Sequence, residues 1–482
     1  MKESPSKFIV VLPFAVSVAA AFLVLWHWFS YDPGRAVVAS VPGMDGRPVG
    51  KDGAPIEDAV NIAGTFVRFE TAAAATELPG CWPNFRGPDR DNIDKEDVKL
   101  ADAWPAGGPK VLWSIDLGEG HAAPAIYAGR VYLLDYDEAK RRDALRCFAL
   151  ADGKELWRRS YAVPAKRNHG LSRTIPAVDA RSVVTLGPRC HVLCVDRESG
   201  NFRWGIDLQR DYGTTEPLWF AGQCPLIEDG IAILAPAGPK TLLMGVDCAT
   251  GKVVWQTPNP AGWKMSHSSV MPMTLCGRKM YVYAAVGGMA GVSAEAEDRG
   301  KLLWQVPWSA NVVAPSPVGI AGDRVFITAG YGAGCLMVQV ARQDQGFAAK
   351  PLFQREPKDW LASEQQTPIY HNGLLYGIMP KDAEALKRQF VGYAPDDKTP
   401  RWSSEKTTRF GLGPFLLADN KFFILNDDGM LTMIKANGNE YVQLGQAKML
   451  SGSDAWGPLA MAGTRMLLRD SKRLICIELG KP

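Results

Sequence analysis

Polar side chains gather in eight short segments that each end in a proline. The segments read GEGHAAP, RNHGLSRTIP, FAGQCP, SHSSVMP, VVAPSP, SEQQTP, RFGLGP and SDAWGP, and their last prolines are residues 124, 176, 225, 272, 317, 368, 414 and 458. The candidate ligand-binding residues in these segments are His121, His169, Arg173, Gln223, His267, Ser268, Glu364, Gln365, Arg409, Asp454 and Trp456. Three imidazoles with a carboxylate could ligate zinc, and the wider set could bind a small molecule or a peptide.

A simpler interpretation is that these residues satisfy backbone groups at strand ends and line a wet channel. We favour this interpretation. We expect no metal site, because its ligands would have to reach across a wide channel. The sequence also contains no G-x-S-x-G, Walker or H-E-x-x-H motif, so we assign no catalytic residue.

Four tryptophans lie six to nine residues before such a proline: Trp219, Trp263, Trp308 and Trp360. They could form an aromatic rim that binds a sugar or a peptide. Packing of the connecting loops is the simpler alternative, and we favour it.

The prolines open a unit that recurs every 44–52 residues. Each unit continues with a second and a third strand pattern and, where the motif is clear, with a glycine-containing turn and a strand that carries tryptophan. The tryptophans are residues 113, 157, 204, 255, 304 and 402, while Phe353 and Leu444 fall in or near the two remaining slots. Four short strands per unit are typical of a β-propeller blade, in which a large aromatic side chain packs between neighbouring sheets.

The two ends of this region supply one unit between them. A tryptophan strand at 110–117 comes before any proline strand, and the last unit, 458–479, has no tryptophan strand after it. We therefore predict an all-β fold, an eight-bladed propeller of four-stranded antiparallel blades over residues 81–482, closed by strand 110–117 joining blade 458–479. The loops that enter the innermost strands would then meet at one mouth, together with the polar residues named above.

The turn-and-tryptophan motif, as in DCATGKVVW, LADGKELW and RESGNFRW, resembles the pyrroloquinoline-quinone (PQQ) repeat. Quinoprotein alcohol dehydrogenases and the BamB-type outer-membrane assembly lipoprotein share that repeat, and both are eight-bladed. The lead-in WPNFRGPDRDN, Trp82–Asn92, is similar to one found in PQQ-like repeat proteins of planctomycete-type bacteria. The likeness covers roughly residues 82–480 and implies the fold; its motif consists of packing and turn residues.

The two branches of this family imply different functions. The BamB likeness implies envelope assembly with a protein or cell-envelope partner, although the first cysteine, Cys81, is far from a lipoprotein position. The dehydrogenase likeness implies PQQ with calcium, a catalytic aspartate and commonly a vicinal cysteine pair. This sequence has no adjacent cysteines and no C-x-x-C-H haem motif. We expect no cofactor, with PQQ and calcium only under the alternative of a quinoprotein-like oxidoreductase.

The N-terminus predicts a membrane anchor. Lys2 and Lys7 precede the apolar stretch Phe8–Phe29, which as a helix would be about 33 Å long at ~1.5 Å per residue. We predict a cytoplasmic tail at 1–7, a transmembrane signal-anchor at 8–29, and a flexible linker rich in Ala, Gly and Pro at 30–80, with a short helix around Glu57–Phe69. The propeller would lie on the periplasmic side of the inner membrane. A cleavable signal peptide is the alternative.

Composition narrows the choice of partners. The net charge is 54 − 51 = +3, without a long basic run, so we expect no nucleic-acid partner. Nine cysteines cannot all pair, and Cys147, Cys194 and Cys476 lie in apolar strand-like runs where we expect them to be buried. The sequence therefore predicts a membrane-anchored, extracytoplasmic binding or scaffolding module for a protein or a cell-envelope component. The alternative is an enzyme with its site at the mouth.

Overall fold

The computed structural model describes residues 17–27, 60–69, 78–165, 169–344, 346–405 and 408–481. The chain divides into two compact units, Met1–Asp58 and Ala59–Pro482. Residues 17–27 of the first unit form an α-helix, and the rest of the predicted tail and anchor lies outside the described residues. Among the residues that are described, no helix has the length and apolar character needed to cross a membrane.

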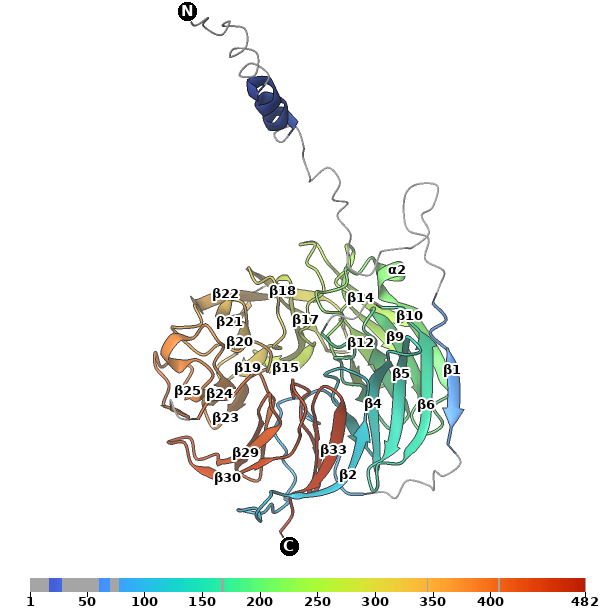
Figure 1. Cartoon of the computed structure of the whole chain (residues 1–482), viewed down its shortest axis with the longest axis vertical. Helices are drawn as coiled ribbons and strands as arrows, with labels where there is room; N and C mark the ends of the chain where they lie inside the picture. Colours follow the sequence, from blue (N-terminus) through green and yellow to red (C-terminus); the bar gives the residue numbers. More distant parts are fainter. Residues whose placement is uncertain are drawn as a thin grey trace, which may run out of the picture. The chain divides into compact units, whose positions relative to one another are not determined.

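The second unit is an eight-bladed β-propeller of antiparallel sheets, as the repeat predicts (Figure 1). Blade 1 contains β3 (Ala125–Tyr127), β4 (Arg130–Asp137), β5 (Arg142–Ala149) and β6 (Glu155–Ala162), with β1 (Thr65–Arg68) outside β6; blade 2 contains β7 (Ala177–Val178), β8 (Ser182–Leu186), β9 (His191–Asp196) and β10 (Phe202–Asp207); blade 3 contains β11 (Leu226–Glu228), β12 (Ile231–Leu234), β13 (Thr241–Asp247) and β14 (Val253–Pro258); blade 4 contains β15 (Met271–Leu275), β16 (Arg278–Ala285), β17 (Gly287–Ser293) and β18 (Leu302–Trp308).

The remaining blades follow the same order from the innermost strand outward. Blade 5 contains β19 (Val318–Ile320), β20 (Arg324–Ala329), β21 (Gly334–Gln343) and β22 (Gly346–Arg355); blade 6 contains β23 (Ile369–His371), β24 (Leu374–Ile378), β25 (Phe390–Tyr393) and β26 (Trp402–Ser403); blade 7 contains β27 (Phe415–Ala418), β28 (Lys421–Leu425), β29 (Met430–Lys435) and β30 (Gln443–Lys448); blade 8 contains β31 (Ala460–Ala462), β32 (Arg465–Arg469), β33 (Arg473–Glu478) and β2 (Lys110–Asp116). A short helix, α2 (Leu208–Tyr212), follows β10, and a 3-10 turn, η2 (Glu384–Leu386), precedes β25.

Blade 8 joins the two ends of the propeller. Strand β2 pairs antiparallel with β33, and Trp113 lies opposite Cys476. The Trp113 indole then donates a hydrogen bond from Nε1 to the carbonyl oxygen of Leu150 in blade 1, at 2.9 Å. One early strand therefore completes the last blade and also contacts the first.

The repeated tryptophans face small residues on the neighbouring strand. Their cross-strand partners are Cys476 for Trp113, Cys147 for Trp157, Cys194 for Trp204, Gly245 for Trp255, Gly291 for Trp304 and Gly392 for Trp402. A Cβ on Gly291 would lie 2.2 Å from the Trp304 ring, so a larger residue cannot occupy this place without a shift. The three strand cysteines are buried, as predicted, and they fill this position.

Four of these indoles, those of Trp113, Trp157, Trp204 and Trp255, pack on a turn glycine of the next blade. Gly251 in the β13–β14 turn has φ +74°, and a Cβ there would lie 2.7 Å from Cγ of Trp204 in blade 2. Gly153 has the same relation to Trp113, and Gly200 to Trp157. Trp204 Nε1 also donates to the carbonyl oxygen of Cys248 at 3.0 Å, so this motif fixes the distance between blades 2 and 3.

Part of the predicted linker belongs to the propeller. Residues 65–68 form β1, which pairs with β6, so the predicted helix around Glu57–Phe69 is wrong over these residues. The physical reason is edge pairing: β1 satisfies the outer edge of β6, while the Phe66 ring lies 6.2 Å from the Trp157 ring and under the Arg159 guanidinium. The linker prediction for 30–80 therefore fails at 60–69; residues 30–59 and 70–77 lie outside the described part.

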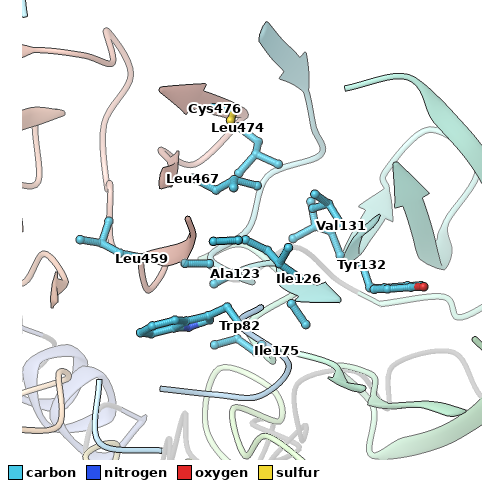
Figure 2. Close-up of a cluster of buried hydrophobic side chains, with 14 of the residues drawn as sticks. Trp82, Ala123, Ile126, Val131, Tyr132, Ile175, Leu459, Leu467, Leu474 and Cys476 are labelled. Carbon is cyan, nitrogen blue, oxygen red and sulfur yellow. The ribbon is translucent and has the colours of Figure 1, made fainter. Parts of the chain in front are cut away.

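The lead-in segment Trp82–Asn92 lies against the innermost strands of several blades. Trp82 bridges to Ile126 of β3, and Figure 2 shows its indole among apolar side chains of blades 1 and 8. Arg86 donates to the carbonyl oxygens of Thr367 and Pro368 at 2.6 and 2.9 Å, just before and at the start of blade 6. Because innermost strands surround the axis of a propeller, this segment fills the centre of the ring.

A buried carboxyl group lies between blades 1 and 2. Asp143 of β5 is 1% exposed, and the Tyr161 hydroxyl donates to its Oδ2 at 2.9 Å. Its Oδ1 has no hydrogen-bond partner among the described residues. Burial raises the pKa of Asp143 to about 7, so the folded protein holds this group protonated in mild acid.

The glycine contact predicts a difference between two matched substitutions. Gly251→Ala and Gly277→Ala both place a side chain at φ above +70°, but a Cβ at Gly277 meets nothing within 4 Å. Each should cost about 1–2 kcal/mol through backbone strain, and Gly251→Ala a further ~1–3 kcal/mol through the clash with Trp204. Chemical denaturation measures both. Equal losses would refute the inter-blade role of Gly251.

The buried Asp143 predicts a pH-dependent effect of Asp143→Asn. The folded-state pKa lies above the unfolded value of about 3.9, so the stability from the protonated group is complete near pH 4 and is lost as the pH rises through 7. The variant should match the parent protein near pH 4 and exceed it by a few kcal/mol above pH 7. Denaturation at both pH values tests this, with Asp97→Asn, whose side chain is 91% exposed, as the control.

Candidate binding site at the propeller mouth

All eight loops that enter the innermost strands contribute to one cavity of about 250 Å³. It is lined by His121, His169, Arg173, Ile175, Trp219, Gly222, Cys224, His267, Ser269, Val312, Ala314, Glu364, Gln365, Gln366, Leu412, Trp456 and Pro458 from these loops, and by Phe85 and Tyr331 from elsewhere. Phe85 belongs to the lead-in segment. The segment in the centre of the ring thus contributes to the wall of the mouth cavity.

Arg173 carries a positive charge into this cavity, and no acidic side chain of the described residues pairs with it. Its Nη2 donates to the carbonyl oxygen of His169, while its Nε is buried and has no hydrogen-bond partner among the described residues. Burial lowers the pKa of Arg173 to about 10, which still leaves the guanidinium charged at neutral pH. A half-buried cation in this state is costly to hold, and an anion that binds to it removes part of that cost.

Two imidazoles beside Arg173 are held neutral. Burial, followed by the charge of Arg173, lowers the pKa of His121 to about 3 and that of His267 to about 4. The His121 ring lies 5.0 Å from the ring of Trp456. Because these rings are uncharged near pH 7, Arg173 dominates the electrostatics on this side of the cavity.

The carboxylate in the cavity lining, Glu364, faces a lysine. Lys381 Nζ lies 3.8 Å from Glu364 Oε1, and burial raises the pKa of Glu364. The same ammonium lies 5.5 Å from the centre of the Tyr331 ring, a cation–π distance. Glu364 is therefore balanced by Lys381 and leaves the charge of Arg173 uncompensated.

Planar rings form a stack at the edge of the cavity. Trp219 lies between His267 and Tyr331, with ring centres 6.5 and 5.7 Å away and planes inclined by 23° and 25°. Tyr331 is 54% exposed, and Leu218, next to Trp219, is 64% exposed. The stack gives the mouth an apolar surface that continues from the cavity to the solvent.

Several residues in the loops around the cavity have a strained backbone. Non-glycine residues with left-handed φ include His169 (+54°), Trp219 (+60°), Phe220 (+72°), Tyr331 (+57°) and Asp454 (+56°). Such conformations cost of order 1–3 kcal/mol each and cluster at functional sites in proteins. Two of them in succession, at Trp219 and Phe220, hold the Trp219 indole in the stack.

Four of the candidate residues lie outside the cavity lining. Gln223 is buried and bonds both backbone groups of Ala235, with its Oε1 accepting at 3.1 Å and its Nε2 donating at 3.2 Å. Ser268 is fully buried, Arg409 donates to the carbonyl oxygen of Lys387, and Asp454 is half-buried beside Ser453. Gln223 and Arg409 thus do what the simpler interpretation assigns to such residues and satisfy backbone groups.

The proposed aromatic rim reduces to Trp219. Trp263, Trp308 and Trp360 are buried, and Trp360 donates from Nε1 to the carbonyl oxygen of Asp397 at 2.7 Å. The rim interpretation is wrong for these three, because they pack in the hydrophobic clusters of blades 3–6. Packing, the alternative considered from the sequence, holds for them.

Sequence reasoning missed Tyr331, Lys381 and Phe85. Tyr331 and Lys381 lie in the loops that join the second and third strands of blades 5 and 6. These loops open at the same face as those before the innermost strands, since every second connection of an antiparallel meander returns to one side. The aromatic and basic residues in these loops were the signal that could have found two of the three.

The donor set of the cavity does not fit a calcium-bound quinone. Calcium takes six to eight oxygen ligands, whereas the lining offers one carboxylate, Glu364, which already faces Lys381. Cys224 is a single cysteine without a neighbour in sequence. Within the described ranges, no three His, Cys, Asp or Glu side chains are placed to hold a metal ion.

Comparison with known proteins agrees with this architecture. A family model described as outer membrane protein assembly factor BamB matches residues 141–389. No curated protein sequence matches the chain significantly. BamB from Moraxella catarrhalis has a similar structure, with a TM-score of 0.51 and 12% identity over 77% of this chain and 99% of that one.

Two dehydrogenases share the fold as well. The quinohemoprotein alcohol dehydrogenase ADHIIG from Pseudomonas putida HK5 has a TM-score of 0.56 and 13% identity, over 85% of this chain and 83% of that one. A europium-containing methanol dehydrogenase has a TM-score of 0.57 and 12% identity, over 84% and 90%. The chain is thus a PQQ-like repeat propeller. It belongs to the family described as outer membrane protein assembly factor BamB, whose model covers more than half of its length.

The different burial of two tryptophans predicts different effects on stability. Trp360→Ala removes a side chain that is 2% exposed and should cost about 3–5 kcal/mol. Trp219→Ala removes a half-buried ring from the mouth and should cost less than about 1 kcal/mol, because it leaves no closed cavity in a core. Chemical denaturation compares them; a loss of several kcal/mol for Trp219→Ala would make this ring a core residue.

Proposed function

We propose that this protein is a membrane-anchored, extracytoplasmic binding module that holds a protein or cell-envelope partner at the propeller mouth. The observation that carries the proposal is the mouth surface itself, with uncompensated Arg173 inside the cavity and the Trp219–Tyr331 stack at its edge. A charged anchor surrounded by exposed aromatic surface is the composition of a binding hot spot.

The chemistry of the cavity supports binding over catalysis. Burial makes two cavity imidazoles, His121 and His267, neutral, and no carboxylate in the described part of the chain is recorded as orienting them. Glu364 is balanced by Lys381. Family membership supports the same choice, since its description names an assembly factor. The apolar stretch Phe8–Phe29 after two lysines supports the anchor and the extracytoplasmic position of the propeller.

Site-specific crosslinking tests whether the mouth binds a partner. A photoreactive amino acid at Leu218, 64% exposed beside the stack, should crosslink a partner in the native host, and Trp219→Ala should abolish that product. The matched control is the same probe at Leu352 on β22, 51% exposed away from the mouth, which should give no such product.

A Leu218 probe that captures nothing, or captures the same proteins with and without Trp219, would contradict the binding proposal. Absorbance of the purified protein with added quinone and calcium tests the oxidoreductase alternative. Stoichiometric PQQ would replace our proposal with that alternative.

A further inference from the structure

The mouth combines a positive charge, Arg173 in the cavity, with an apolar surface, the Trp219–Tyr331 stack at the cavity edge. We propose that the occupant is a polypeptide segment in which an acidic side chain lies beside an aromatic or large aliphatic one, with the carboxylate on Arg173 and the apolar side chain against Trp219 and Tyr331. This inference rests on the proposed function, because it names what the mouth binds.

The charge of the mouth selects an acidic group. Arg173 has a buried Nε without a partner among the described residues, and its charge acts on His121, His267 and Tyr331, which surround it. A guanidinium presents its donors in a fork that matches a carboxylate. The Nε end of this fork is buried, so a neutral amide would leave part of its hydrogen-bonding capacity unmet.

The apolar surface selects what accompanies the acidic group. The stack of His267, Trp219 and Tyr331 offers ring faces at the cavity edge, and Leu218 extends the apolar surface outward. A free ion such as acetate would leave that surface exposed. An aromatic or aliphatic side chain next to the acidic residue covers it and gains the free energy of apolar burial.

The position of these groups favours a chain over a compact molecule. Arg173 lies within the cavity, whereas the stack runs from the cavity edge to residues that are more than half exposed. A ligand that contacts both must enter the cavity and also extend along the rim. A polypeptide segment meets this requirement, because one side chain can enter the cavity while the backbone carries its neighbour along the rim.

The strained loop is consistent with a prepared surface. Trp219 and Phe220 have left-handed φ, and Glu216 at the base of the same loop is ion-paired with Arg189 at 2.8 Å. A ring already held in place loses little rotational freedom when the ligand arrives. Folding therefore already supplies part of the ordering that binding would otherwise require.

Binding of short peptides to the purified full-length chain tests the inference. The probe is acetyl-Gly-Ser-Asp-Phe-Ser-Gly-amide, whose single charge is the aspartate side chain. Its comparisons replace Asp by Asn or Phe by Ala, and benzoate serves as a small carboxylate. Because a hydrogen bond to a charged group contributes about 1.5–3 kcal/mol, the Asp peptide should bind roughly 10- to 150-fold more tightly than the Asn peptide in calorimetry at low salt.

Variants of the chain assign that preference to one side chain. Arg173→Gln should remove the difference between the Asp and Asn peptides, and Arg173→Lys should retain part of it. Lys350→Gln, which removes one positive charge from the exposed strand β22, should leave the preference unchanged. Melting curves check folding, and Arg173→Gln should melt at the same or a higher temperature, because it removes an uncompensated cation.

The peptide measurements can refute the acidic group of the ligand or its polypeptide nature separately. Equal affinity for the Asp and Asn peptides, a preference that survives Arg173→Gln, or no peptide binding at millimolar concentration refutes recognition of an acidic segment. Benzoate binding as tightly as the peptide refutes the polypeptide part. If any of these occurs while the Leu218 crosslink persists, the ligand class is wrong and the binding function stands; if the crosslink is absent too, both fall.

Discussion

The contact between an indole and a glycine of the next blade is the constraint on which this propeller depends. Trp204 packs on Gly251, donates a hydrogen bond to Cys248 and faces the small side chain of Cys194. Each part excludes alternatives: the turn needs a left-handed φ, the indole needs the space of a missing Cβ, and the neighbouring strand needs a small residue. The motif repeats because the same geometric problem arises at one blade junction after another.

The loops at the mouth take no part in spacing the blades, so their sequences are free to vary. Because strands and turns fix the distances between blades, the loops before the innermost strands do not have to resemble one another, and none of the eight does. They hold strained residues such as Trp219 and Tyr331 and an uncompensated Arg173. A rigid ring can support local features of this kind, which would otherwise destabilise a smaller fold.

The central segment changes how the mouth should be understood. Sequence reasoning treated the centre of the ring as a wide channel, too wide for side chains from several loops to ligate one metal ion. Arg86, held by carbonyl oxygens of blade 6, and Trp82, beside β3, fill that centre, and Phe85 between them lines the cavity. The mouth is therefore a pocket of limited size, in which Arg173 lies close enough to His121 and His267 to lower their pKa.

The sequence predicts the number of blades, their strand order and the closing role of the strand that carries Trp113, because turn glycines, strand prolines and tryptophans are local requirements that repeat. It also identified the loops of the mouth. It could not separate Trp219, which stacks at the rim, from Trp360, which is buried, because both lie in a loop a few residues before a blade-opening proline. It also did not predict that Tyr331 lies near Arg173, or that residues 65–68 form a strand and not part of a linker. Those outcomes depend on contacts between residues distant in the chain, because the burial of a side chain is set by neighbours that the local sequence does not contain.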